Sequence, residues 1–78
     1  TCIMPHITIK TLPGKTPEMK QRLVKELETV VSKTFEVPVG NISISIQEVE
    51  NDCWDQAVVE PYLKKHKDTV VKFPDYPY

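Results

Sequence analysis

The sequence is poor in cysteine and glycine and has no long apolar run, and these shortages exclude several protein classes. Two cysteines, Cys2 and Cys53, provide neither a disulfide framework nor a CxxC zinc site. The two histidines, His6 and His66, are isolated, so we expect no metal. No stretch approaches the roughly 20 apolar residues of a membrane helix. We therefore expect a soluble protein in a reducing, cytoplasmic compartment.

A strong excess of one charge is also absent. Ten basic and eleven acidic side chains nearly cancel, so the chain lacks the broad positive field that nucleic-acid backbones select. The one local excess is the basic run at residues 64–67, which is typical of a solvated helix face. We expect neither nucleic-acid nor membrane partners.

What the chain does have is the composition of one small folded domain, with 78 residues of which 40% are hydrophobic and 27% charged. A domain of this size buries only roughly 60 to 65% of its unfolded surface. Such chains often depend on partner subunits for stability.

Residue periodicity predicts a β-α-β unit of the α+β class. Residues 6–12 and 42–47 alternate with period two and are rich in β-branched types, which is typical of strands. Between them, Thr16 and Pro17 favour a helix start, and Val37-Pro38 favours its end. The apolar positions of this helix predict one packing stripe, made of Leu23, Val24, Leu27, Val30, Val31, Thr34 and Phe35. A helix joining the strands predicts that they are parallel.

The C-terminal third predicts short helices and an extended arm. Asp52 and Asp55 favour a short helix through Val59, and Pro61 is expected to divide it from a second helical stretch over residues 62–71. Residues 73–78 contain three aromatic residues and two prolines, so we expect an arm that lies on a surface.

Two strands and one helix do not make an independently stable sheet, and each strand leaves an open edge. We therefore expect a homodimer that joins two β-α-β units into a four-stranded sheet with the helices on one face. The expected protein partner is therefore a second copy of the same chain.

Pro5 is the most informative residue, because it follows Met4 at the head of the first strand. A proline uncovered by removal of an initiator methionine becomes a secondary amine, which is both a base and a nucleophile. With residues 1–4 attached, the same nitrogen is an amide without basicity. We expect residues 1–4 to be left over from the expression vector or to be an unprocessed leader, and residues 5–78 to be the single domain. A strand-initial proline without any chemical role is the alternative.

The order and spacing of several segments resemble the 4-oxalocrotonate tautomerase superfamily, and in particular its small dimeric branch. The segments are Met4-Pro5-His6-Ile7, Pro13-Gly14-Lys15-Thr16, Val37-Pro38, the strand over residues 42–46, and Trp54. The resemblance implies a cofactor-free tautomerase in which Pro5 is the general base.

The resemblance also assigns substrate-binding roles. Lys15 falls where the family commonly has an arginine for a substrate carboxylate, and Trp54 falls where an aromatic residue walls the pocket. A lysine keeps the charge but not the bidentate fork. The second family arginine aligns with Ser43, which puts activity on the dienol diacid of the family in doubt. His6, next to Pro5, is a further candidate for substrate contact or simply a surface strand residue.

Two functions from different classes follow. The first is a keto-enol tautomerase acting on a small enol or 2-keto acid such as phenylenolpyruvate, inactive when residues 1–4 block Pro5. The second is a non-catalytic dimeric module of the same fold that binds a ligand or a protein, which the missing arginine favours.

Overall fold

The computed structural model describes residues 4–78. Its centre is a pair of strands, β1 (His6–Thr11) and β2 (Ser43–Glu48), joined through the helix α1 (Pro17–Phe35). The strands are parallel and in register from His6 opposite Ser43 to Thr11 opposite Glu48. The predicted β-α-β unit is therefore confirmed, with each strand within one residue of its expected bounds. Of the expected leader, only Met4 lies within the described residues.

The helix α1 begins where the sequence predicts. The backbone N–H of Met19 donates to Thr16 Oγ1 at 3.1 Å, which caps the helix, and Pro17 occupies its first turn. The helix ends at Phe35, before the predicted stop, because Glu36 adopts a left-handed conformation with φ of 57°. The N–H of Val37 then donates to the Ser32 carbonyl, and Ser32 Oγ donates to the Val37 carbonyl. These bonds complete the C-terminal cap.

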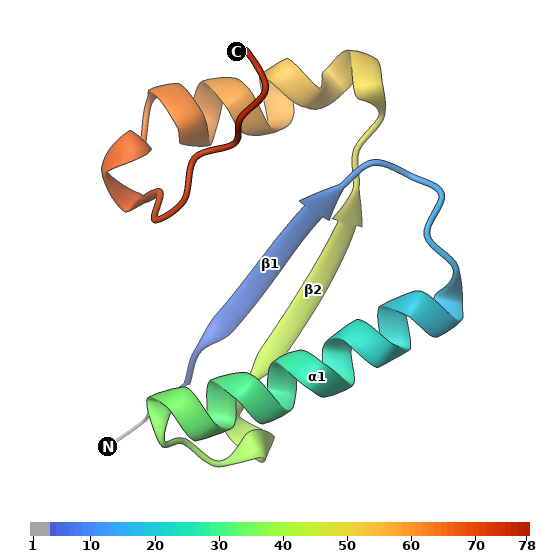
Figure 1. The fold of residues 1–78 in the computed structure, drawn as a ribbon, viewed down its shortest axis with the longest axis vertical. Helices are drawn as coiled ribbons and strands as arrows, with labels where there is room; N and C mark the ends of the chain where they lie inside the picture. The colour runs from blue at the N-terminus through green and yellow to red at the C-terminus, as the bar shows by residue number, and fades with distance from the viewer. Residues whose placement is uncertain (1–3) are drawn as a thin grey trace.

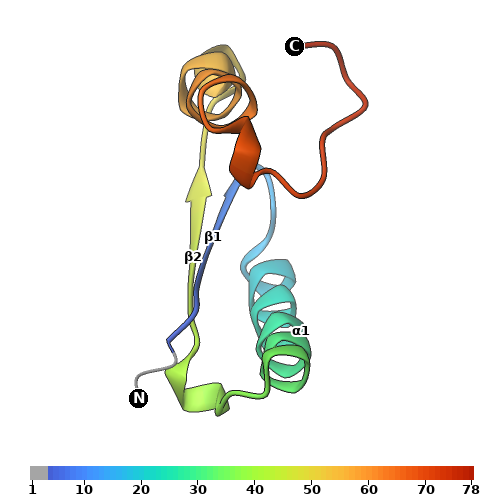
Figure 2. The same cartoon turned by 90° about the vertical axis from the view of Figure 1, so that its left-hand side faces the viewer.

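The sheet has two different faces. Figure 2 shows α1 lying on one side of the two strands. The alternation of residues places the isoleucines of both strands on the α1 side, where they are half-buried. The opposite face carries polar side chains, among them His6, Thr8, Ser43 and Ser45.

The predicted apolar stripe of α1 is only partly a packing face. Val24, Leu27 and Val31 are half-buried, whereas Leu23, Val30 and Phe35 remain exposed, Val30 by 58%. A narrow two-stranded sheet covers only part of the helix surface, so the outer part of the stripe has no partner within residues 4–78.

The prediction that Pro61 divides two helices is wrong. After a 3-10 turn (η2, Asn51–Cys53), a single π-helix (η3, Asp55–Lys64) runs through Pro61, and only a short 3-10 turn (η4, Lys67–Thr69) follows. Pro61 has no N–H to offer the Ala57 carbonyl in an α-helical pattern, and the wider π turn relieves its steric conflict with that carbonyl. Lys10 Nζ, 3.3 Å away, donates to the Ala57 carbonyl instead. The same ammonium lies 5.1 Å from the centre of the Tyr62 ring.

The core of one chain is small. The buried hydrophobic residues among those described are Val37, Val59 and Leu63, and none of them belongs to α1 or to the sheet. The radius of gyration is 14.3 Å, whereas compact domains of this length have roughly 11 to 12 Å. In Figure 1 the C-terminal helices extend past the ends of the strands rather than packing over α1. The fold thus leaves apolar surface that a second chain can cover.

Candidate active site

Pro5 is half-buried at the amino end of β1, and its position is set by the sheet. The backbone N–H of Ser43, the first residue of β2, donates to the Pro5 carbonyl oxygen at 3.2 Å. In this chain the Pro5 nitrogen is bonded to the exposed Met4 and is an amide. Because the strand pairing begins at residue 5, a free amine there would be attached to ordered backbone rather than to a flexible side chain.

His6 lies at the same end, on the polar face of the sheet. Its Nδ1 is hydrogen-bonded to Ser43 Oγ at 2.6 Å, and its Nε2 lies 3.4 Å from Ser45 Oγ. Ser45 Oγ in turn donates to Thr8 Oγ1 at 3.2 Å. No local signal indicates that His6 and the two serines meet, because His6 and Ser43 are 37 positions apart and only the parallel register brings them together. His6 thus has protein partners at both ring nitrogens.

Lys15 and Trp54 lie at the opposite end of the strands. Lys15 follows β1 and lines a cavity of about 290 Å³ between the sheet and α1, together with Ile9, Met19 and Leu23 among others. Trp54 follows β2 and lines a different cavity, of about 270 Å³, with Leu12, Asn51 and Tyr76. At about 3.3 Å per residue, the six residues of β1 span roughly 17 Å or more between Pro5, which precedes the strand, and the backbone that follows it. One chain therefore pairs Pro5 with His6 but brings neither Lys15 nor Trp54 to Pro5.

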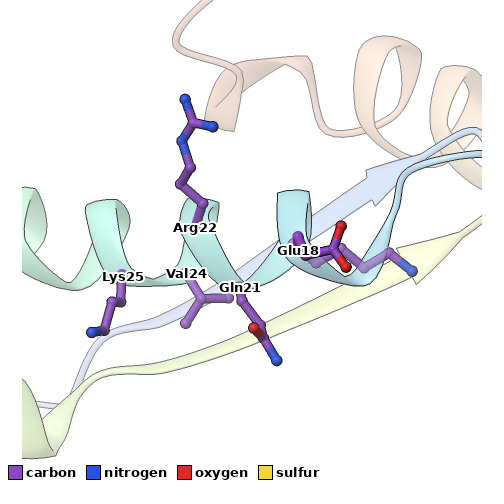
Figure 3. Close-up of a pocket in the computed structure, with 6 residues that line it drawn as sticks. Glu18, Gln21, Arg22, Val24 and Lys25 are labelled. Carbon is purple, nitrogen blue, oxygen red and sulfur yellow. The ribbon is translucent and has the colours of Figure 1, made fainter.

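A further cavity in the described part of the chain, of about 660 Å³, lies elsewhere and has a single wall. Its six lining residues all belong to the first half of α1, and they include Glu18, Gln21, Arg22 and Lys25. Figure 3 shows Arg22 and Gln21 pointing away from opposite sides of this helix. One helix cannot enclose a ligand, so we regard this region as open helix surface rather than as a binding pocket.

Two classes of site or element are not found within residues 4–78. No group of three or more His, Cys, Asp and Glu side chains there could hold a metal ion. No helix in this range combines the length and the apolarity needed to cross a membrane.

Comparison with known proteins identifies the family. The family model described as tautomerase enzyme matches residues 5–61, so its match begins at Pro5. Tautomerase PptA of Pectobacterium carotovorum subsp. carotovorum strain PC1 is 34% identical over 76 residues, which cover 96% of this chain and all of that protein. A probable tautomerase of Listeria monocytogenes serovar 1/2a is 40% identical over 47 residues, covering 60% of this chain and 77% of that protein.

A solved structure agrees with the sequence relatives. YwhB, a homologue of 4-oxalocrotonate tautomerase, superposes with a TM-score of 0.63 and 31% identity, covering 78% of this chain and 97% of that one. The expected resemblance is confirmed, and the chain belongs to the tautomerase enzyme family, within the 4-oxalocrotonate tautomerase superfamily.

Proposed function

We propose that the domain of residues 5–78 is a cofactor-independent keto-enol tautomerase that acts on a small enol or 2-keto acid such as phenylenolpyruvate. Pro5 is its general base. The observation that carries the proposal is the position of Pro5, at which the family match begins and which the Ser43 N–H holds at the start of the sheet. Relatives named as tautomerases support the reaction class.

The chemistry requires a free, neutral amine at Pro5. A terminal α-amine titrates near 8 in model peptides, so a useful fraction is unprotonated at neutral pH. The amine takes the proton of the enol hydroxyl and returns a proton to the adjacent carbon, which yields the keto acid. A base held in position contributes about 10²- to 10⁴-fold to such a step. An amide nitrogen cannot do this, so a chain that retains Met4 is inactive.

Two chains complete the site in this proposal. The commonest homo-oligomer is a two-fold dimer, and a two-fold axis normal to the sheet makes the paired edge strands antiparallel with both helices on one face. That arrangement brings the amino end of one sheet, with Pro5, toward the carboxyl end of the other, with Lys15 and Trp54. The small core and the exposed apolar residues of α1 support a dimer. Lys15 then binds the substrate carboxylate, and Trp54 walls the pocket.

A second candidate function is a dimeric binding module without catalysis. Ser43 occupies the position of the family's second arginine, and its hydroxyl is hydrogen-bonded to His6. No cation at position 43 is therefore available to polarise a substrate carbonyl. A ligand can still bind in such a site without being turned over.

The deciding experiment compares three chains in a phenylenolpyruvate ketonisation assay. The first begins at Pro5, the second retains Met4, and the third begins at residue 5 with Pro5→Ala. We expect turnover only for the first, with the others lower by about 10²-fold or more. Intact mass spectrometry verifies each N-terminus. Equal rates above buffer for the first and second chains would refute Pro5 as the base and leave the binding module as the better explanation.

A further inference from the structure

The cavity beside Trp54 is formed by three separate segments of the chain. Leu12 directly follows β1, Asn51 begins η2, and Tyr76 belongs to the C-terminal arm. Its volume is about 270 Å³. A dry cavity of roughly 150 Å³ already accepts benzene, so a flat ring with a short linker has room here. Leu12 and the two aromatic rings make the walls largely apolar.

The C-terminal arm is held in place at this cavity. After η4 the chain reverses direction, as Figures 1 and 2 both show. Trp54 Nε1 donates a hydrogen bond to the Tyr76 hydroxyl at 3.0 Å. The Tyr78 ring meets the Tyr76 ring edge-on, with 6.2 Å between their centres. Tyr76 is therefore fixed by its indole partner on one side and by an aromatic neighbour on the other.

We propose that Tyr76 is a specificity-determining residue, and that the cavity which it forms with Trp54 and Leu12 receives the aromatic substituent of an enol acid. The inference rests on the proposed function, because only in the proposed dimer does this cavity face a Pro5, that of the other chain. Edge-on or offset contact with Trp54 and Tyr76 adds binding free energy for an aromatic ring, but not for a short aliphatic or charged chain. The arm thus selects for arylated enol acids over dicarboxylic ones.

The test compares two substrates in chains that begin at Pro5. Tyr76→Ala removes the ring, Tyr76→Phe removes only the hydroxyl, and Phe73→Ala is a control from the same arm that lies outside the cavity lining. We expect Tyr76→Ala to raise the KM for phenylenolpyruvate about tenfold, with kcat, and the KM for an enol acid that carries only a short aliphatic chain, within about twofold of the parent. Phe73→Ala should leave the KM of both substrates unchanged. Tyr76→Phe should retain most of the preference for phenylenolpyruvate over the other substrate.

A binding measurement separates this inference from the proposed function. Trp54 is the only tryptophan, so its fluorescence reports directly on the cavity. We expect 3-phenylpropanoate to change this fluorescence and its Kd to rise about tenfold in Tyr76→Ala. If Tyr76→Ala left the Kd of 3-phenylpropanoate unchanged, or raised the KM of both substrates equally, Tyr76 would not be a specificity-determining residue. If Pro5→Ala stayed active, catalysis by Pro5 would be refuted while the titration still decided the role of the cavity.

Discussion

The N–H of Ser43 and the carbonyl of Pro5 form the first hydrogen bond between the two strands, with 3.2 Å between nitrogen and oxygen. The hydroxyl of the same serine is hydrogen-bonded to His6. The first residue of β2 therefore contacts both Pro5, which directly precedes β1, and His6, the first residue of β1. The sheet thus anchors the backbone on the carbonyl side of Pro5.

Removing the Ser43 N–H should harm catalysis more than removing its hydroxyl. Ser43→Ala keeps the backbone bond to Pro5, and we expect kcat within about twofold and a stability change within about 0.5 kcal/mol. Ser43→Pro removes the donor at a strand-initial position, where proline is otherwise tolerated. Kcat should then fall about tenfold or more, since small misplacements of a reacting group are costly. Circular dichroism checks that both variants fold, and equal kcat values for the two would contradict this role of the hydrogen bond.

Lys15 should act on substrate binding through its charge. Lys15→Ala should raise the KM for phenylenolpyruvate about tenfold, because a hydrogen bond to a charged group contributes about 1.5 to 3 kcal/mol. Lys15→Arg should keep or lower the KM, since the guanidinium adds a bidentate fork. Steady-state kinetics with the Pro5 terminus measure both. The matched control is Lys25→Ala, which removes an exposed lysine of α1. The same KM change in this control would contradict a specific role of Lys15 in substrate binding.

The rate should rise with pH through a single ionisation. The base works as the neutral amine, so turnover is low where Pro5 is protonated and reaches a plateau above the pKa of its amine. That pKa should lie at or below the model-peptide value of about 8, because the partial burial of Pro5 and, in the proposed dimer, Lys15 of the other chain both disfavour the protonated form. The pH profile of kcat/KM, together with NMR titration of ¹⁵N-labelled Pro5, gives the value. If kcat/KM did not change between about pH 5 and about pH 9, which spans the model-peptide pKa of an α-amine, the Pro5 amine would be excluded as the base.

Stability should depend on protein concentration. If two chains share the exposed stripe of α1, the melting temperature rises with concentration by mass action. Val30→Lys should be nearly neutral in a monomer, because Val30 is 58% exposed there. In a dimer it should instead lower the melting temperature and promote dissociation. Analytical ultracentrifugation measures the association, with the exposed Lys33→Gln as control, and a concentration-independent melting temperature would contradict an obligate dimer.

The end of α1 offers a stabilising substitution. Glu36 has φ of 57° and ψ of 51°, a left-handed conformation that costs a side-chain-bearing residue about 1 to 2 kcal/mol. Glycine adopts it without this strain but loses more chain entropy. We expect Glu36→Gly to raise the free energy of unfolding by about 0.5 to 1 kcal/mol, as measured by urea denaturation. Glu28→Gly, in the helix interior, should lower it by about 1 kcal/mol.

The sequence by itself determined the elements whose signals are local. Alternation of β-branched residues predicts each strand within one residue, and the Thr16-Pro17 pair predicts the start of α1, because these preferences depend on neighbours a few residues away. The order of motifs also identified the family. Proline in the interior of η3 misled the prediction, since a π turn and the Lys10 ammonium compensate for what Pro61 cannot provide.

Only the tertiary structure decided which side chains meet. His6 and Ser43 are joined by the parallel register, and Trp54 meets Tyr76 because the chain reverses after η4. It also separated Pro5 from Lys15 and Trp54, by placing them at opposite ends of β1. Periodicity specifies the face and the length of an element, but contacts between residues far apart in sequence depend on how the elements pack.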